Sequence, residues 1–330
     1  MHRNRLFLIL LTAAWLAASA TAASARPSTP LTATQVEYTI PTGSSQPAGI
    51  TSGPDGLIWF AESSTNKIGK VTASGSFNEY TVPTAGATPL NIITGPDGNL
   101  WFTERVGNKI GKITTSGTVT EYGGLTASAA LWDIVAGSDG NLWFTEHDTN
   151  KIGKITTSGT VTEYTVPTAS STPYGITSGS DGALYFTENA VGKLGRITTA
   201  GSFTEYALPS STSSPRGITA APDGKLWFVQ STTNLLASIT ISFTGYTAYT
   251  IPTGGSGLAY VAPESGVANV WVTENTANKV ASAYIEPSCC TEYAVTTAGS
   301  GPFRIVQGRD LNMYFTENSA GKIGKIYVSS

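Results

Sequence analysis

The residues best suited to acid–base chemistry lie near the middle of the chain. His147 is followed directly by Asp148, and Trp132 and Asp133 lie a short way upstream. An imidazole can accept a proton near neutral pH, and a carboxylate bonded to it fixes its tautomer. We therefore predict His147 as a catalytic base and Asp133 or Asp148 as the acid that orients it, beside a substrate platform formed by Trp132. The alternative is an exposed loop histidine beside ordinary acids, since a single histidine lacks metal-ligand spacing.

A second group of residues suits ligand binding. A phrase of the form Pro-x-x-Ile recurs in five repeats, and the other two repeats hold an equivalent segment without the proline. The variable second letter reads Ala48, Leu90, Trp132, Tyr174, Arg216, Leu258 and Phe303. If the repeats form a ring of sheets, these letters face its channel, where pockets of closed β folds form. The predicted ligand-binding residues are Leu90, Arg105, Trp132, Tyr174, Arg216, Leu258 and Phe303. With Arg304 nearby, this surface is apolar, aromatic and partly positive, which suits a small-molecule, peptide or carbohydrate ligand.

Recurrent glutamates form a third group. They are Glu62, Glu104, Glu146, Glu188, Glu274 and Glu317. Metal chemistry rarely needs the same group in every repeat, so we interpret these residues as structural acceptors for loop backbone N–H groups. No metal-ligating residues are predicted.

The elements that must position these side chains follow a long repeat. The phrase that begins at Trp59 returns at Trp101, Trp143, Tyr185, Trp227, Trp271 and Tyr314, at intervals of 42 to 44 residues. Each repeat holds four runs of strand-forming residues separated by turn residues. Four antiparallel strands in a period of this length are typical of a propeller blade. The predicted fold class is all-β, a seven-bladed β-propeller of four-stranded antiparallel blades.

The two ends of the chain predict how the ring closes. A fourth-strand tyrosine recurs seven times, from Tyr38 to Tyr293, yet Tyr38 precedes the first complete repeat. The last repeat stops after its third strand, residues 322–326. We predict that the N-terminal strand, residues 36–40, completes the last blade and removes an unpaired sheet edge.

The first residues predict export. A basic head, an apolar run over residues 6–18 and small residues at 23–25 are typical of a secretory signal peptide. The run is shorter than the roughly 20 residues that a membrane span needs. We predict a signal peptide at 1–25, a linker at 26–33 and the propeller at 34–330, in a secreted protein (extracellular or periplasmic) without a membrane span.

The composition of the chain excludes some classes of binding partner. Charged residues make up 12% of the chain and the formal net charge is −3. Nucleic-acid binding needs clustered Lys and Arg, so this chain is not expected to bind nucleic acid. The protein is expected to be a monomer. The only cysteines are the neighbours Cys289 and Cys290. Their position leaves both a vicinal disulfide and two free thiols open.

The repeated text resembles a known family. The phrases Gly-Pro-Asp-Gly-x-Leu-Trp-Phe-Thr-Glu, Asn-Lys-Ile-Gly-Lys-Ile-Thr and Thr-Glu-Tyr-Thr-Val-Pro-Thr closely resemble the streptogramin B lyase (virginiamycin B lyase) family over residues 34–328. The resemblance implies a seven-bladed propeller that opens the ester of a cyclic depsipeptide antibiotic by elimination, with Mg²⁺ as cofactor. It also implies catalytic histidines at the second letter of Pro-x-x-Ile and a metal-associated glutamate just before one proline.

This chain departs from the family at those positions. None of the seven second letters is histidine. The residues before the proline position read Gln46, Thr88, Ala130, Thr172, Ser214, Ser256 and Gly301, and none is glutamate. A shared scaffold does not fix a reaction.

Two functions therefore stay open. One is a secreted binding protein that acts through an aromatic channel mouth without the family's catalytic residues. The other is a carbon–oxygen lyase that opens cyclic depsipeptide or lactone esters by Mg²⁺-assisted elimination, with a rearranged site at His147. A six-bladed metal-dependent lactonase is disfavoured, because the repeat count is seven.

Overall fold

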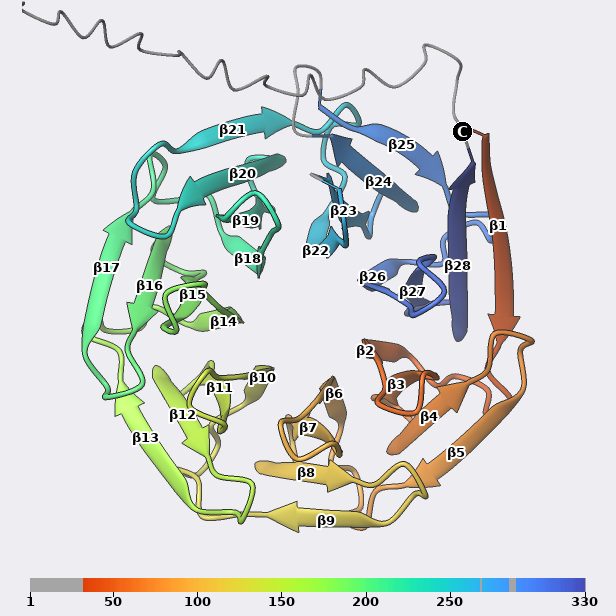
Figure 1. Ribbon diagram of the computed structural model, residues 1–330, viewed down its shortest axis with the longest axis horizontal. Coiled ribbons are helices and arrows are strands. Elements are labelled where there is room, and N and C mark those ends of the chain that lie inside the picture. The colour runs from red at the N-terminus through yellow and green to blue at the C-terminus, as the bar shows by residue number, and fades with distance from the viewer. Residues whose placement is uncertain (1–31, 268, 285–288, 330) are drawn as a thin grey trace, which may run out of the picture.

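Seven four-stranded antiparallel sheets form a closed ring around a central axis (Figure 1). The computed structural model describes residues 32–267, 269–284 and 289–329. Within each sheet the first strand lies nearest the axis and the fourth lies at the rim. The fold class predicted from the repeats is therefore confirmed.

The blades divide the chain evenly. Blade one holds β2 (Pro47–Ser52), β3 (Ile58–Glu62), β4 (Lys67–Val71) and β5 (Phe77–Thr81); blade two holds β6 (Pro89–Thr94), β7 (Leu100–Glu104), β8 (Lys109–Ile113) and β9 (Val119–Tyr122). Blade three holds β10 (Leu131–Ala136), β11 (Leu142–Glu146), β12 (Lys151–Ile155) and β13 (Val161–Thr165); blade four holds β14 (Pro173–Ser178), β15 (Leu184–Glu188), β16 (Lys193–Ile197) and β17 (Phe203–Ala207). Blade five holds β18 (Pro215–Ala220), β19 (Lys225–Gln230), β20 (Leu235–Thr240) and β21 (Thr247–Thr250); blade six holds β22 (Leu258–Glu264), β23 (Asn269–Glu274), β24 (Lys279–Tyr284) and β25 (Thr291–Ala294). Blade seven holds β26 (Pro302–Gln307), β27 (Met313–Glu317), β28 (Lys322–Ser329) and β1 (Thr32–Thr39).

The repeated aromatic pair packs the blades against each other. Trp59 and Phe60 are both fully buried, and successive strand residues point to opposite faces of a sheet. Trp59 packs with Phe102 of blade two, and Phe60 packs with Tyr314 of blade seven. Each pair therefore places one large ring in each of its blade's two interfaces. Burial of an aromatic side chain contributes roughly 2–3 kcal/mol, so this arrangement makes the ring cohesive.

In five of the seven blades a glycine in the third strand makes room for the second ring, and blades five and six have Ala237 and Ala281 there. A methyl group at Gly69 would overlap the ring of Phe60, and one at Gly111 would overlap Phe102. The Lys-Ile-Gly-Lys phrase therefore keeps its glycine for packing. Its first lysine forms an ion pair with the fourth strand, since Lys109 contacts Glu121 at 3.0 Å.

The ring closes between the two ends of the described chain. β1 pairs antiparallel with β28, with Tyr38 opposite Ile323. Glu37 of β1 contacts Lys322 at 2.8 Å and accepts a bond from the backbone N–H of Thr297 at 2.7 Å. Closure by the N-terminal strand is as predicted, although the strand begins at Thr32, before residue 36. The predicted signal peptide and most of the predicted linker lie outside the described residues.

Two smaller expectations concern the membrane and the cysteines. The described residues contain no helix long and apolar enough to cross a membrane. Cys289 and Cys290 are bonded to each other, so of the two open alternatives the structure has the vicinal disulfide. The pair packs against the core cluster of blades five and six.

Candidate functional site

A repeated irregularity in the inner strands aims side chains at the channel. In every blade the pairing of the first two strands shifts register between the proline position and the isoleucine position, for example between Pro47 and Ile50. Such a bulge re-aims the residues within it. Both variable letters of Pro-x-x-Ile therefore belong to the lining of the channel rather than to the regular pleat.

A left-handed residue before each inner strand fixes the neighbouring loop. These residues are Gln46, Thr88, Ala130, Thr172, Ser214, Gly257 and Gly301, with φ between 46° and 69°. Their carbonyl groups accept bonds from the loop that follows the second strand. Arg105 donates its N–H to Thr88 at 3.1 Å, and His147 donates its N–H to Ala130 at 3.3 Å. The loop residues and the inner-strand residues are therefore held as one surface.

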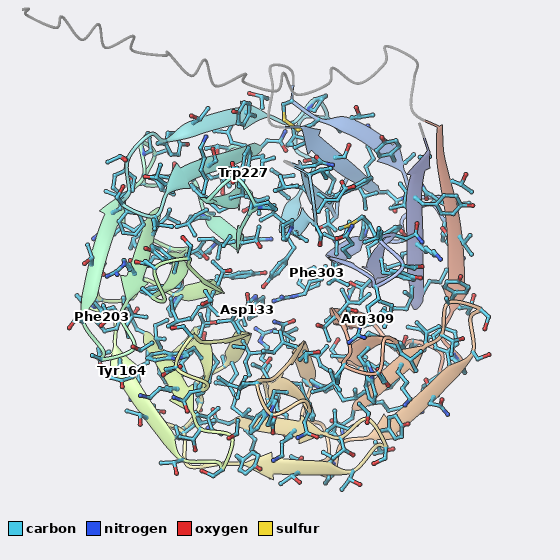
Figure 2. The ribbon with its side chains drawn as sticks, in the orientation of Figure 1. Asp133, Tyr164, Phe203, Trp227, Phe303 and Arg309 are labelled. Carbon is cyan, nitrogen blue, oxygen red and sulfur yellow. A yellow bond between two sulfur atoms is a disulfide. The ribbon has the colours of Figure 1, made fainter. Side chains whose placement is uncertain are left out.

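That surface encloses a cavity of about 470 Å³ at the mouth of the channel. Its lining is Ala48, Ser63, Leu90, Arg105, Trp132, His147, Tyr174, Asn189, Arg216, Phe303 and Asn318. Six of the seven predicted ligand-binding residues lie here, together with the predicted base, His147. Figure 2 shows Phe303 and Asp133 near the centre of the ring, whereas Phe203 and Tyr164 lie at its rim.

Aromatic and cationic side chains form a continuous row across the mouth. The ring centroids of Trp132 and Tyr174 are 4.6 Å apart. The guanidinium of Arg105 lies 4.4 Å from the Trp132 ring, and that of Arg216 lies 5.7 Å from the Tyr174 ring. We call Arg105, Trp132, Tyr174 and Arg216 the mouth row. It spans blades two to five.

His147 adjoins this row. Its ring lies 5.6 Å from that of Trp132, and its Nδ1 atom lies 2.5 Å from Oδ1 of Asp148. Of the two acids proposed from the sequence to orient the histidine, Asp148 is therefore the one in contact. Asp148 is largely exposed, with 60% of its side chain accessible.

Asp133 lies deeper and bonds to other residues. It is 3% exposed and forms an ion pair with Arg304 at 3.1 Å. Tyr260 donates its hydroxyl to Oδ2 of Asp133 at 2.9 Å, and Asn91 donates to Oδ1. Backbone N–H groups of Ile134 and Ile176 also donate to it. The predicted pairing of Asp133 with His147 is wrong, because every described bond of Asp133 goes elsewhere.

The interior contacts of Asp133 form a plug across the channel. We define the plug as Asn91, Asp133, Tyr260 and Arg304, which come from blades two, three, six and seven. Arg304 also lies 3.4 Å from the ring centroid of Tyr260 and donates to its hydroxyl. The plug residues occupy the third letter of Pro-x-x-Ile. The other three blades have Gly49, Gly175 and Gly217 there, where a side chain would meet the next inner strand.

The plug was not predicted from the sequence. Its signal lies in the third letter of the phrase, where four repeats have a large polar residue and three have glycine. Arg304, expected at the mouth, is 7% exposed and belongs to the plug.

One predicted ligand-binding residue lies elsewhere. Leu258 pairs with Glu274, as Pro47 pairs with Glu62, so it occupies the proline position rather than the variable letter. It is fully buried in the core cluster of blades five and six. The second letter of blade six is Ala259, and the residue before the proline position is Gly257 rather than Ser256. The prediction for Leu258 is wrong, because a buried leucine fills the space that proline fills in other blades.

The recurrent glutamates are structural, but not in the manner expected. Glu62 and Glu146 accept bonds from the hydroxyls of Thr65 and Thr149, both at 2.8 Å, instead of from loop N–H groups. All six are fully buried. Burial, and to a smaller extent the neighbouring fourth-strand carboxylate, raise the pKa of Glu62 and Glu146 to about 7, although the threonine hydroxyl bonds act in the opposite direction.

Charge is divided between the two ends of the channel. No carboxylate belongs to the cavity lining, and within the described residues neither Arg105 nor Arg216 forms an ion pair. The aspartates of the turns between the first and second strands lie at the other end of the strands. There Asp310 contacts Lys325 at 2.9 Å and Asp181 contacts Arg196 at 2.7 Å. The lining is therefore aromatic with two positive side chains and no carboxylate of its own, and Asp148 lies next to it through its contact with His147.

This donor set does not fit Mg²⁺. The ion prefers oxygen ligands in octahedral geometry, commonly carboxylates. Among the described residues no group of three His, Cys, Asp or Glu side chains could hold a metal. Two guanidinium groups at the mouth also repel a cation.

The comparisons with known proteins agree with this fold. Residues 12–261 and 210–330 match the virginiamycin B lyase family. A solved streptogramin B lyase has a TM-score of 0.86 at 36% identity, over 90% of this chain and 98% of that chain. Virginiamycin B lyase from Staphylococcus aureus, selenomethionine-substituted, has a TM-score of 0.84 at 35% identity, over 89% and 99% of the two chains.

A further solved structure is a catalytically inactive histidine-to-alanine variant of the Staphylococcus aureus virginiamycin B lyase with quinupristin. It gives the same TM-score of 0.84 at 35% identity, over 89% of this chain and 99% of that chain. From these matches, the chain belongs to the virginiamycin B lyase family.

Proposed function

We propose that this member of the virginiamycin B lyase family is a secreted binding protein whose ligand occupies the channel mouth. The observation that carries the proposal is the mouth row lining a cavity of about 470 Å³. Ligand cavities of a few hundred Å³ lined by aromatic side chains and a few polar groups are typical binding sites. Trp132 and Tyr174 supply flat surfaces that stay rigid when a ligand binds.

The absence of the family's catalytic letters supports binding over catalysis. The second letters of Pro-x-x-Ile contain no histidine, and the residues before the proline position contain no glutamate. An elimination needs a base for the acidic proton and a group that stabilises the resulting negative charge. In the cavity lining, His147 is the only candidate base.

The binding proposal is tested by screening cyclic peptides, oligosaccharides and aromatic acids against the protein by ligand-observed NMR. The same library is screened against Trp132→Ala and against Tyr327→Ala, a control that removes an exposed aromatic residue of β28 away from the mouth. Hits that lose at least tenfold in affinity with W132A, and keep it with Y327A, support the proposal. A library without any W132A-sensitive hit refutes it.

Export is part of the proposal and rests on the N-terminal sequence pattern. N-terminal sequencing of the protein recovered outside the cytoplasm tests it. Recovery of full-length protein in the cytoplasm alone would contradict secretion.

A second candidate function is lyase activity centred on His147. The observation in its favour is that His147 lines the cavity and contacts Asp148 at 2.5 Å. As base, the imidazole would remove the proton next to the ester-bearing carbon while the carbon–oxygen bond breaks, which leaves a carbon–carbon double bond and a free carboxylate.

Incubation with a streptogramin B antibiotic and Mg²⁺ tests the lyase. Elimination gives a linear product of unchanged mass, whereas hydrolysis adds one water. Turnover that disappears in His147→Ala supports the lyase and opposes the binding proposal. Turnover that is equal in the variant removes His147 as base.

A further inference from the structure

We infer that the ligand of the mouth is a flat ring compound that carries a carboxylate, and that Arg216 is the residue that binds this anion. The inference rests on the proposed function and makes it chemically specific. It depends on the charge of the lining, the stacking of the two arginines and the burial of one guanidinium nitrogen.

The two arginines of the mouth row lack acidic partners. The described ion pairs include Arg196 and Arg304 but neither Arg105 nor Arg216. In both cases the guanidinium lies over an aromatic ring. Stacking uses the face of the guanidinium and leaves its N–H donors at the edge free for an oxyanion.

Of the two arginines, Arg216 has the more buried guanidinium. Its Nε atom is buried and has no hydrogen-bond partner among the described residues. Because Nε is covered by protein, the donors that can reach a ligand in the cavity are the two terminal nitrogens, which have no hydrogen-bond partner among the described residues. A carboxylate that accepts from both terminal nitrogens would form a bidentate, charge-assisted pair with Arg216. Arg105 is exposed, so its contribution is long-range attraction of the anion.

The side chains next to Arg216 indicate which chemical group should adjoin the carboxylate of the ligand. Tyr174 lies beside Arg216, and Trp132, whose ring is tilted by 48° to that of Tyr174, extends the aromatic surface toward Arg105. Leu90 and Phe303 contribute further apolar lining. A planar apolar ring next to the carboxylate therefore meets a complementary surface. An aromatic carboxylate is the first expectation. A uronic acid, whose sugar ring can turn an apolar C–H face to the aromatic side chains, is the second source of the same anion.

The test compares 2-naphthoate with 2-naphthamide, which differ in charge and share a shape. Binding is measured by tryptophan fluorescence and by calorimetry at 50 and 500 mM NaCl. We expect the naphthoate to bind at least tenfold more tightly at low salt, with the difference shrinking at high salt. Galacturonate and galactose form the second pair.

Three variants test whether Arg216 is the residue that binds the carboxylate. Arg216→Gln should reduce the preference for naphthoate over naphthamide to twofold or less. Arg216→Lys keeps the charge but loses the fork, so it should retain only part of the preference. Arg309→Gln, at the opposite end of the channel where Arg309 bonds to Pro54, should change nothing.

Each outcome has one meaning. A preference for naphthoate, or for galacturonate over galactose, that disappears with R216Q supports the inference and identifies the source. Equal binding of each acid and its neutral partner overturns the inference and leaves the proposed function intact. Failure of all four probes while another ligand shows W132A-sensitive binding also overturns only the inference. If nothing binds at the mouth, both fail.

Discussion

Replacing Glu104 by glutamine should stabilise the protein at neutral pH and leave it unchanged in acid. Glu104 ends β7, is fully buried, and neither of its carboxylate oxygens has a hydrogen-bond partner among the described residues. Burial, and next the charge of Glu121, raise the pKa of Glu104 from 4.5 to about 8. Despite its partial burial, Glu121 has a lowered pKa, because Thr84 and Lys109 bond to its charged form.

The sign and size of the effect follow from linkage. The folded protein holds the Glu104 proton more tightly than the unfolded chain, so stability is lost as the pH rises from 4.5 toward 8. Each pKa unit is worth about 1.36 kcal/mol, so the interval from 4.5 to pH 7 corresponds to about 3 kcal/mol. Screening at the strand end reduces this to about 2 kcal/mol.

Glutamine keeps the volume of glutamate but cannot ionise. Glu104→Gln should therefore raise the free energy of unfolding by about 2 kcal/mol at pH 7 to 8 and by less than about 0.5 kcal/mol at pH 4.5. Blade five already carries this change. There Gln230 occupies the position, and Leu235 and Ala248 replace the lysine and the outer-strand acid.

Urea unfolding followed by tryptophan fluorescence between pH 4.5 and 8.5 measures the difference, with equal m-values as the condition for comparison. Glu121→Gln is the control of opposite sign, since it removes the partner of Lys109 and should destabilise most at neutral pH. A gain for E104Q that is the same at pH 4.5 and pH 8 would refute the reasoning, as would no gain at pH 8.

Three further predictions follow from the plug, the packing glycines and the seam. Asp133→Ala should cost about 3–5 kcal/mol in the free energy of unfolding, because Arg304 is left buried without its partner; a double variant that also carries Arg304→Met should recover part of this in urea unfolding. Gly111→Ala should cost about 1–3 kcal/mol and lower the melting temperature, since the methyl group overlaps Phe102; an unchanged melting temperature would contradict that overlap. Glu37→Gln should make β1 more sensitive to limited proteolysis, because its ion pair across the seam is lost; equal cleavage rates would show that backbone pairing alone holds the strand.

The blades could be predicted from the sequence because each is specified locally. The phrase around Trp59 contains its own turn, its own packing rings and the glycine that accommodates one of them. Seven copies of a locally consistent pattern leave few alternatives. Closure was also predictable, since Tyr38 is a fourth-strand residue without a blade of its own.

A residue of the candidate site could be placed from the sequence only where its position depends on one blade alone. The second letter of Pro-x-x-Ile located Trp132, Tyr174 and Phe303 at the mouth, because a repeat position maps to one place around the axis. The plug needs residues from four blades to meet, and no single repeat encodes that meeting. Leu258 was misplaced because proline is absent from its copy and only the strand register shows the true position.

The glutamate pairs were hidden for a related reason. Glu104 and Glu121 lie in different strands of one blade, and Gly111 of the strand between them carries no side chain to separate them. The sequence shows two ordinary acids. Only the register of the three strands shows that the charge of Glu121 raises the pKa of Glu104.

The seam between β1 and β28 joins strands from the two ends of the described chain, and we expect the ring to open there first. Glu37 and Lys322 are separated by 285 positions in the chain, so their contact forms late in folding and is the natural place for the ring to open first. β26, which carries Phe303 and Arg304, belongs to the blade that this seam completes. A molecule held between Phe303 and the blades on the far side of the mouth would act as a clasp. A ligand bound at the mouth should then slow amide hydrogen exchange in β1, at the rim of the ring.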